Sequence, residues 1–119
     1  MSVSEEFSTF VNARGISLDS LGVPELAFTP CDALAAIQLL RGGDVGVLGG
    51  DALIRKGNRI AFGGESWHCE RGRDEDLEKW VKRSLDVAGQ YISRFPNPAD
   101  SVLFTIIWSE SEIQCDAGS

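Results

Sequence analysis

The sequence contains few of the residues that metal, redox or disulfide chemistry requires. It has one histidine and three widely spaced cysteines, Cys31, Cys69 and Cys115. An odd number of cysteines completes no disulfide framework, and none of the three forms a C-x-x-C pair. A zinc site needs about four converging histidine, cysteine or acidic ligands. We therefore expect reduced thiols, no metal ion and no cofactor, with Cys31 and Cys69 in the core and Cys115 exposed in a tail.

A long hydrophobic run and a basic leader are also missing. The longest apolar stretch, residues 102–108, is far shorter than the roughly 20 residues that cross a bilayer. Residues 1–6 carry acid where a secretory signal has basic residues followed by an apolar run. We expect a cytoplasmic protein that has no membrane partner.

Basic charge is scarce, because 11 lysines and arginines stand against 18 acids and the formal net charge is −7. The phosphates of a nucleic acid would be repelled by such a surface, so no nucleic-acid partner is expected. The acid either complements a basic protein or is an ordinary solvated surface. Hydrophobic residues at 43% and charged residues at 24% are typical of folded chains. The length predicts a single domain over residues 1–108 and a flexible acidic tail over residues 109–119.

Two short helices are predicted in the N-terminal part from apolar spacings of three and four residues. The first spans residues 2–14, where Ser2 and Glu5 have the spacing of a capping box. The second spans residues 31–41 and follows Thr29-Pro30, because threonine caps helices and proline suits the first helical position. It is apolar nearly all round, which indicates burial on more than one side.

The longest helix is predicted over residues 74–95, with Glu75 and Lys79 as an acid-first ion pair on its outer face. Gly89 lies in the helix interior, where glycine is unfavourable, so a close contact with a neighbouring element is expected there. Residues 16–28 are predicted to form a packed loop rather than a regular element.

Strands are expected between residues 44 and 70, where the apolar period falls towards two and glycines multiply. The pattern predicts strands over residues 51–55 and 59–62, joined by a hairpin at Gly57, and a third strand over residues 66–69. The continuous apolar run 102–108 predicts a strand covered on both faces. The fold class is therefore α+β, a short antiparallel β-meander plus a C-terminal strand, packed against the long helix and the two shorter N-terminal helices.

No catalytic or nucleotide-binding motif is found. The glycine-rich stretch runs into Asp51, whose charge would repel a phosphate. The predicted third strand places His68 on one face and Trp67 and Cys69 on the other, so histidine and thiol cannot act as a pair. We predict that the protein is not an enzyme and has no catalytic residues. The alternative is a small ligand-binding domain or enzyme that uses the Gly49-Gly50-Asp51 turn and the His68 neighbourhood.

Several short motifs occur in a fixed order along the chain. They are the apolar helix over residues 33–40, Val47-Leu48-Gly49-Gly50-Asp51, Trp67-x-Cys69, the helix around residues 80–91 and the closing strand near residues 104–108. In this order the sequence resembles the immunity protein 40 family over roughly residues 15–108. The resemblance implies a non-catalytic, cytosolic immunity protein of a bacterial polymorphic toxin system, which binds the C-terminal domain of its cognate toxin and neutralises it by occlusion.

A toxin with a basic surface would associate faster with an acidic partner, while buried aromatic or apolar anchors would slow dissociation. The candidate contact surface is one end of the meander, and its candidate residues are Asp51, Glu65, Trp67, His68, Glu70 and Asp74. The acids among them are also compatible with ordinary solvated strand ends. A homodimer through an exposed edge strand stays open as well.

Overall fold

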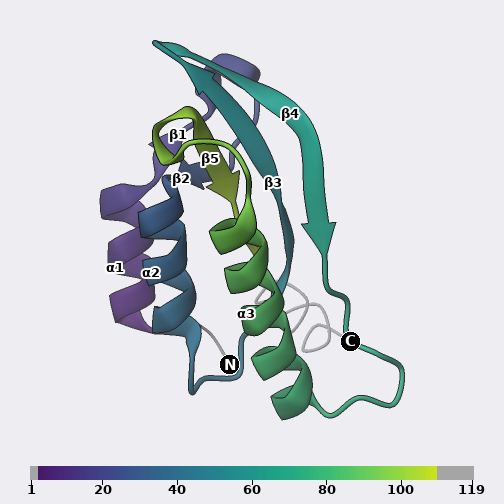
Figure 1. The fold of residues 1–119 in the computed structure, drawn as a ribbon. Helices are drawn as coiled ribbons and strands as arrows, with labels where there is room; N and C mark the ends of the chain where they lie inside the picture. Colours follow the sequence, from purple (N-terminus) through teal and green to yellow (C-terminus); the bar gives the residue numbers. More distant parts are fainter. Residues whose placement is uncertain (1–2, 110–119) are drawn as a thin grey trace.

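The fold is given by a computed structural model that describes residues 3–109. Its elements are, in chain order, α1 (Glu5–Arg14), β1 (Ile16–Ser17), η1 (Asp19–Leu21), β2 (Leu26–Phe28), α2 (Pro30–Leu40), β3 (Val47–Lys56), β4 (Arg59–His68), α3 (Leu77–Arg94), η2 (Ala99–Ser101), β5 (Val102–Thr105) and β6 (Ile107–Trp108). The strands form one antiparallel sheet in the order β1-β2-β5-β3-β4, with β6 paired to β3. The three α-helices lie on one side of this sheet (Figure 1). The predicted α+β class is confirmed.

The first two helices begin at local capping signals. Ser4 caps α1, because its hydroxyl accepts a hydrogen bond from the Phe7 N–H at 3.1 Å. The predicted cap, Ser2, lies outside the described residues. Thr29 caps α2 as predicted, with its hydroxyl accepting from the Asp32 N–H at 3.2 Å. A side-chain oxygen satisfies one of the first-turn donors that have no partner inside the helix.

Helix α3 begins at Leu77, three positions later than predicted, because the preceding residues fold into a loop of their own. The predicted pairing of Glu75 with Lys79 is wrong, since Glu75 instead binds Arg83 at 2.7 Å. The close contact predicted at Gly89 is also wrong. A Cβ atom added there would have no heavy atom within 4 Å outside the helix and its chain neighbours.

Both faces of the sheet are packed around β5. On the helix face, Ala52 and Phe104 belong to the main core, which also contains Trp80 and Phe7. On the opposite face, a second cluster is formed by Leu18, Ala27, Leu53 and Leu103. Adjacent residues of one strand point to opposite sides, so neighbours in the sequence enter different clusters. All four residues of β5 are buried, as the continuous apolar run predicted.

The predicted three-stranded meander is a two-stranded hairpin. β3 contains the predicted first strand, and β4 runs through the predicted second and third strands without a turn at Gly63 and Gly64. The register jumps there, because Ala52 pairs with Glu65 while Leu53 pairs with Phe62. The two glycines are therefore extra residues in a β-bulge, which bends the strand instead of ending it. The predicted hairpin turn is confirmed at Gly57, which has a φ of 58°.

Three further predictions need correction. The segment expected to be a packed loop contains β1 and β2, and β2 pairs with β5. The predicted strand over residues 102–108 is divided at Ile106 into β5 and β6. Cys31 is exposed instead of buried, whereas Cys69 is buried as expected, and both are free thiols. Cys115 and the predicted tail beyond Ser109 lie outside the described residues.

Candidate partner-binding surface

The Gly49-Gly50-Asp51 segment is part of strand β3, so the prediction that it forms a turn is wrong. A Cβ atom on Gly50 would lie 2.5 Å from the Trp67 indole and would overlap the carbonyl oxygen of Thr105. A Cβ atom on Gly49 would overlap the carbonyl oxygen of Trp67. The glycines allow neighbouring groups to approach the backbone closely, which is a packing role.

Trp67 lies in the core, with 6% of its surface exposed. Its ring stacks on Tyr91 of α3 at a centroid distance of 4.8 Å and meets Phe104 of β5 edge-on at 6.4 Å. Trp67 therefore offers little surface to a partner in the free protein. Cys69 lies on the same buried side, as predicted, and His68 is exposed. Burial raises the pKa of the Cys69 thiol, the opposite of what a cysteine nucleophile requires.

An uncovered part of the sheet lies on the face away from the helices. Gly49 pairs with His68 on one side and with Ile107 on the other, and residues directly opposite one another share a face. Phe62 shares this face because it pairs with Leu53 of the second cluster. Asp51 and Ser66 form the pair between them. We call this surface the open face and define it by Asp51, Phe62, Ser66, His68 and Ile107.

The open face carries exposed apolar side chains. Phe62 is 52% exposed and Ile107 is 45% exposed, and they are the large hydrophobic side chains that stand exposed in residues 3–109. Beside Ile107 is a hollow of about 370 Å³ that His68 and Glu70 also line. The side chains of Ile107, His68 and Glu70 are all exposed, so this hollow is an open depression. An enclosed pocket for a small ligand, which the alternative interpretation needs, is not formed by these groups.

The four candidate acids do not form one cluster. Asp51 lies on the open face and is half-buried, whereas Glu65 pairs with Ala52 and therefore lies on the helix face. Glu70 and Asp74 are exposed in the loop that joins β4 to α3. The structure brings only Glu70 and His68 of the candidate residues into the same hollow. The candidate acids thus surround the β4 margin of the sheet on both faces.

The loop over residues 69–76 is held by Arg83 of α3. Its guanidinium donates to the two carboxylate oxygens of Glu75 at 2.7 and 2.8 Å. It also donates to the Glu70 carbonyl at 2.9 Å and to the Cys69 sulfur at 3.2 Å. Hydrogen bonds from Arg83 and from the Gly72 N–H lower the pKa of Glu75 to about 2.

We call these contacts of Arg83 with the loop the clasp. The sequence did not reveal it, because Glu75 and Arg83 are eight positions apart and Glu75 lies in the loop before α3. Helical spacing rules search pairs three or four residues apart. The clasp fixes the path of the loop, and so determines where Glu70 and Asp74 stand relative to His68.

Comparison with known proteins decides the family. The family model of immunity protein 40 matches residues 17–108. The chain belongs to the immunity protein 40 family. The match covers most of the chain and agrees with the resemblance in the motif order, and it points to a toxin-neutralising role. No curated protein and no solved structure matches the chain.

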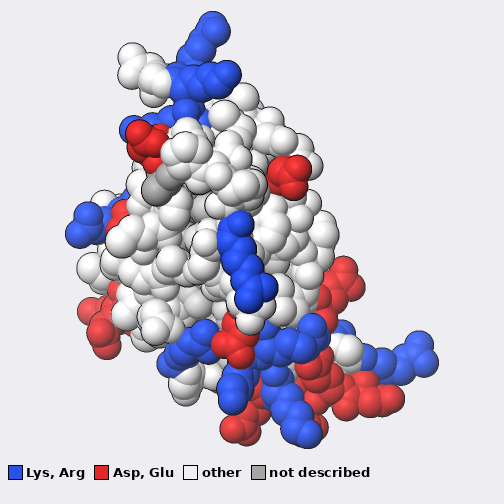
Figure 2. Space-filling model, viewed as in Figure 1, with Lys and Arg blue, Asp and Glu red and all other residues white. Residues whose placement is uncertain are grey.

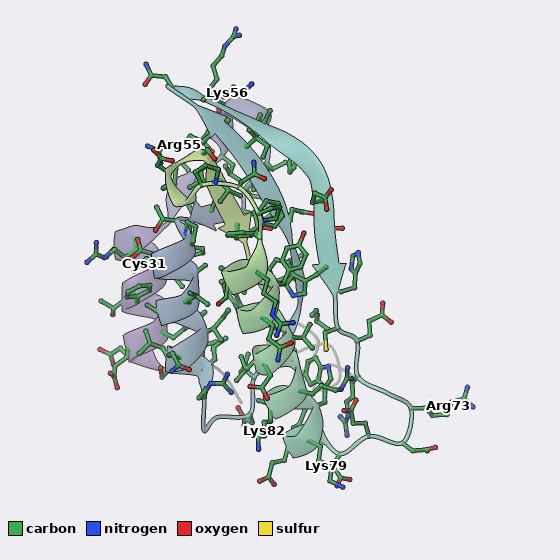
Figure 3. All side chains as sticks on the ribbon, viewed as in Figure 1. Cys31, Arg55, Lys56, Arg73, Lys79 and Lys82 are labelled. Atoms are coloured by element: carbon green, nitrogen blue, oxygen red, sulfur yellow. The ribbon has the colours of Figure 1, made fainter. Side chains whose placement is uncertain are left out.

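The charge of this immunity protein is unevenly distributed. On the face seen in Figure 2, lysine and arginine gather at the tip of the β3–β4 hairpin, while both signs are mixed at the opposite end. Figure 3 labels Arg55 and Lys56 at the tip, and Arg73, Lys79 and Lys82 at the mixed end. Largely uncharged surface separates the two ends. The acidic excess therefore does not form one continuous patch on this side of the molecule.

Two features are missing from the described part of the immunity protein. Within it no three or more histidine, cysteine or acidic side chains are placed to hold a metal ion. Over the same residues no helix has both the length and the apolar character that a bilayer crossing requires.

Proposed function

We propose that this protein binds the C-terminal domain of a cognate bacterial toxin in the cytoplasm and neutralises it by occlusion, without catalysing a reaction. The observation that supports this most directly is the open face. Two large apolar side chains, Phe62 and Ile107, stand exposed there beside the polar Asp51 and His68. Exposed apolar groups rimmed by polar residues are typical of protein interaction sites.

The proposed contact surface has two parts with different roles. Phe62 and Ile107 are the anchors, which lose their contact with water on binding and limit the dissociation rate. Glu70 and Asp74 stand exposed in the adjoining loop, and Glu65 stands exposed on the helix face of β4. These acids attract a basic toxin, which increases the association rate. Truncating an anchor at the centre of an interface costs about 2 kcal/mol or more, which is roughly thirtyfold in Kd.

Co-expression tests the function directly. The chain is produced together with the product of the adjacent toxin gene, and growth and co-purification are measured. We expect rescued growth and a stable complex. Unchanged toxicity together with no co-purification would reject the proposal.

Surface variants test the contact residues. Ile107→Ser and Phe62→Ser should each weaken the complex by about thirtyfold while the thermal unfolding midpoint stays close to that of the wild type. Glu70→Lys should mainly slow association. Glu78→Lys serves as its control, because Glu78 is an exposed acid on α3 that lines a hollow with residues 41–44. Equal effects of the two lysine variants would remove the loop from the proposed surface.

A second copy of the chain is the other candidate occupant of this region. Within residues 3–109, β4 is an edge strand that pairs with β3 alone, so a homodimer through its other side would extend the sheet. The Gly63-Gly64 bulge interrupts this edge, and bulges hinder edge-to-edge pairing. We therefore propose a monomer, which light scattering during gel filtration checks.

A further inference from the structure

Two buried polar atoms in the core lack a hydrogen-bond partner among the described residues. They are the indole Nε1 of Trp67 and the hydroxyl oxygen of Tyr91, whose rings stack on each other. Buried polar groups in native proteins are nearly always paired, because an unpaired one has lost its water without replacement. A phenylalanine at position 91 would keep the stack and avoid this cost. The hydroxyl is therefore expected to serve binding, because it does not stabilise the free protein.

Tyr91 also lines a hollow of about 400 Å³ between β4 and the C-terminal half of α3. Glu65 stands on its β4 side, Val87 and Phe95 supply apolar lining, and Arg94 lies at the last turn of α3. No described side chain forms an ion pair with Glu65. We call this feature the Tyr91 hollow.

The electrostatic environment of the Tyr91 hydroxyl is negative. Burial raises the pKa of Tyr91 first, and the nearby carboxylates of Glu65 and Asp51 raise it further. The phenol is therefore neutral at physiological pH and can donate its proton to an acceptor. A cation entering the hollow would be attracted by the carboxylate of Glu65, which lines it, whereas an anion would be repelled by the same group.

We propose that the Tyr91 hollow receives a lysine or arginine side chain of the cognate toxin. This inference rests on the proposed toxin-binding function and names the chemistry of one contact. The apolar stem of the basic side chain packs against Tyr91 and Phe95, and its cation pairs with Glu65. The pairing draws the Glu65 carboxylate into the hollow, where the Tyr91 hydroxyl donates to it. Glu65 and the Tyr91 hydroxyl then each have a partner that they lack in the free protein.

Arg94 opposes such a ligand because it carries the same charge. Its side chain is exposed at the end of α3, so it remains solvated and can turn away from the hollow. Its removal should therefore strengthen binding, whereas removal of Glu65 should weaken it. Stronger binding without Arg94 together with weaker binding without Glu65 would show that the toxin side chain in the hollow is positively charged.

The test uses the full chain and the toxin domain encoded by the adjacent gene, with Kd measured by calorimetry. Glu65→Gln and Tyr91→Phe should each weaken binding by about tenfold or more, because each removes a charge-assisted hydrogen bond. Arg94→Gln should tighten binding several-fold at low salt. Glu78→Gln, at an exposed acid elsewhere on α3, should leave the Kd unchanged.

Thermal unfolding of the free variants separates binding from folding. Tyr91→Phe should unfold at the same temperature as the wild type or higher, since it removes an unpaired buried hydroxyl. A midpoint several degrees lower would show that the hydroxyl stabilises the free fold, and would overturn the inference. If the wild type binds toxin and both the Glu65 and Tyr91 variants bind within twofold of it, only the inference fails. If the wild type neither binds nor protects, the proposed function fails and the inference fails with it.

Discussion

Replacing Gly50 by alanine tests whether the glycines of β3 serve packing. The added Cβ atom would lie 2.5 Å and 2.8 Å from two carbons of the Trp67 indole and would overlap the Thr105 carbonyl oxygen. Ordinary carbon contacts are about 3.5 to 4.0 Å, so something must move. Thr105 belongs to β5, which is paired on both sides, and Trp67 cannot shift without disturbing its stack on Tyr91.

The size of the effect follows from these contacts. Overpacking a core costs about 1 to 3 kcal/mol, and losing an aromatic stack costs about 0.5 to 1.5 kcal/mol. Alanine recovers only about 0.4 to 1 kcal/mol by restricting the unfolded chain. We expect Gly50→Ala to lower the free energy of unfolding by about 2 kcal/mol or more. At roughly 4 °C per kcal/mol for a domain of this size, the thermal midpoint should fall by about 8 °C.

The loss of unfolding free energy is measured by urea unfolding, which tryptophan fluorescence follows. The shift of the urea midpoint reports this loss when the slope of the free energy against urea concentration is the same in both proteins. A midpoint equal to that of the wild type or higher would refute the packing role. The Gly49-Gly50-Asp51 segment would then again need a functional explanation, such as the ligand-binding turn that the strand geometry argues against.

Three other predictions follow from single contacts. Gly89→Ala, in the open interior of α3, should raise the free energy of unfolding by up to about 1 kcal/mol, and an unchanged or lower urea midpoint would contradict this. Ser84→Ala removes a buried hydroxyl that accepts from the Val47 N–H at 3.0 Å, so stability should fall by about 1 to 3 kcal/mol in the same assay. The pKa of Glu75 is held near 2, below its ordinary 4.5, chiefly by hydrogen bonds from Arg83. Its stabilising effect is therefore present above about pH 4.5 and is lost as the pH falls towards 2, so the wild type and Glu75→Gln should converge in stability over that range. A difference that stays constant with pH would contradict this.

Local chemistry was enough to predict several elements. Thr29-Pro30 determines the start of α2, because a hydroxyl cap and a fixed φ act within one turn. Gly57 determines the β3–β4 turn, because a positive φ is easy only for glycine. The amphipathic spacing revealed α3, and the continuous apolar run revealed β5 as a strand buried on both faces. Each of these signals depends on residues that are close together in the chain.

The pairing of strands could not be predicted in the same way. β2 is three residues long and is a strand because it pairs with β1 and with β5, and β5 lies far along the chain. The glycines at positions 63 and 64 have the same local preferences in a turn as in a bulge. These two glycines form a bulge because β4 pairs with β3 both before and after them.

The candidate site shows the same division. The sequence determined that Trp67 and His68 point to opposite sides of one strand, because side chains alternate in any strand. Only the packing of α3 against the sheet decided which of the two sides is buried, and so placed Trp67 in the core and His68 on the open face. Tertiary structure also created the hollow between Glu65 and Tyr91 and the clasp between Glu75 and Arg83. The alternation of side chains along a strand and the capping of a helix arise within a few neighbouring residues. The burial of a side chain and the identity of its interaction partner depend on chain segments that only the folded state brings together.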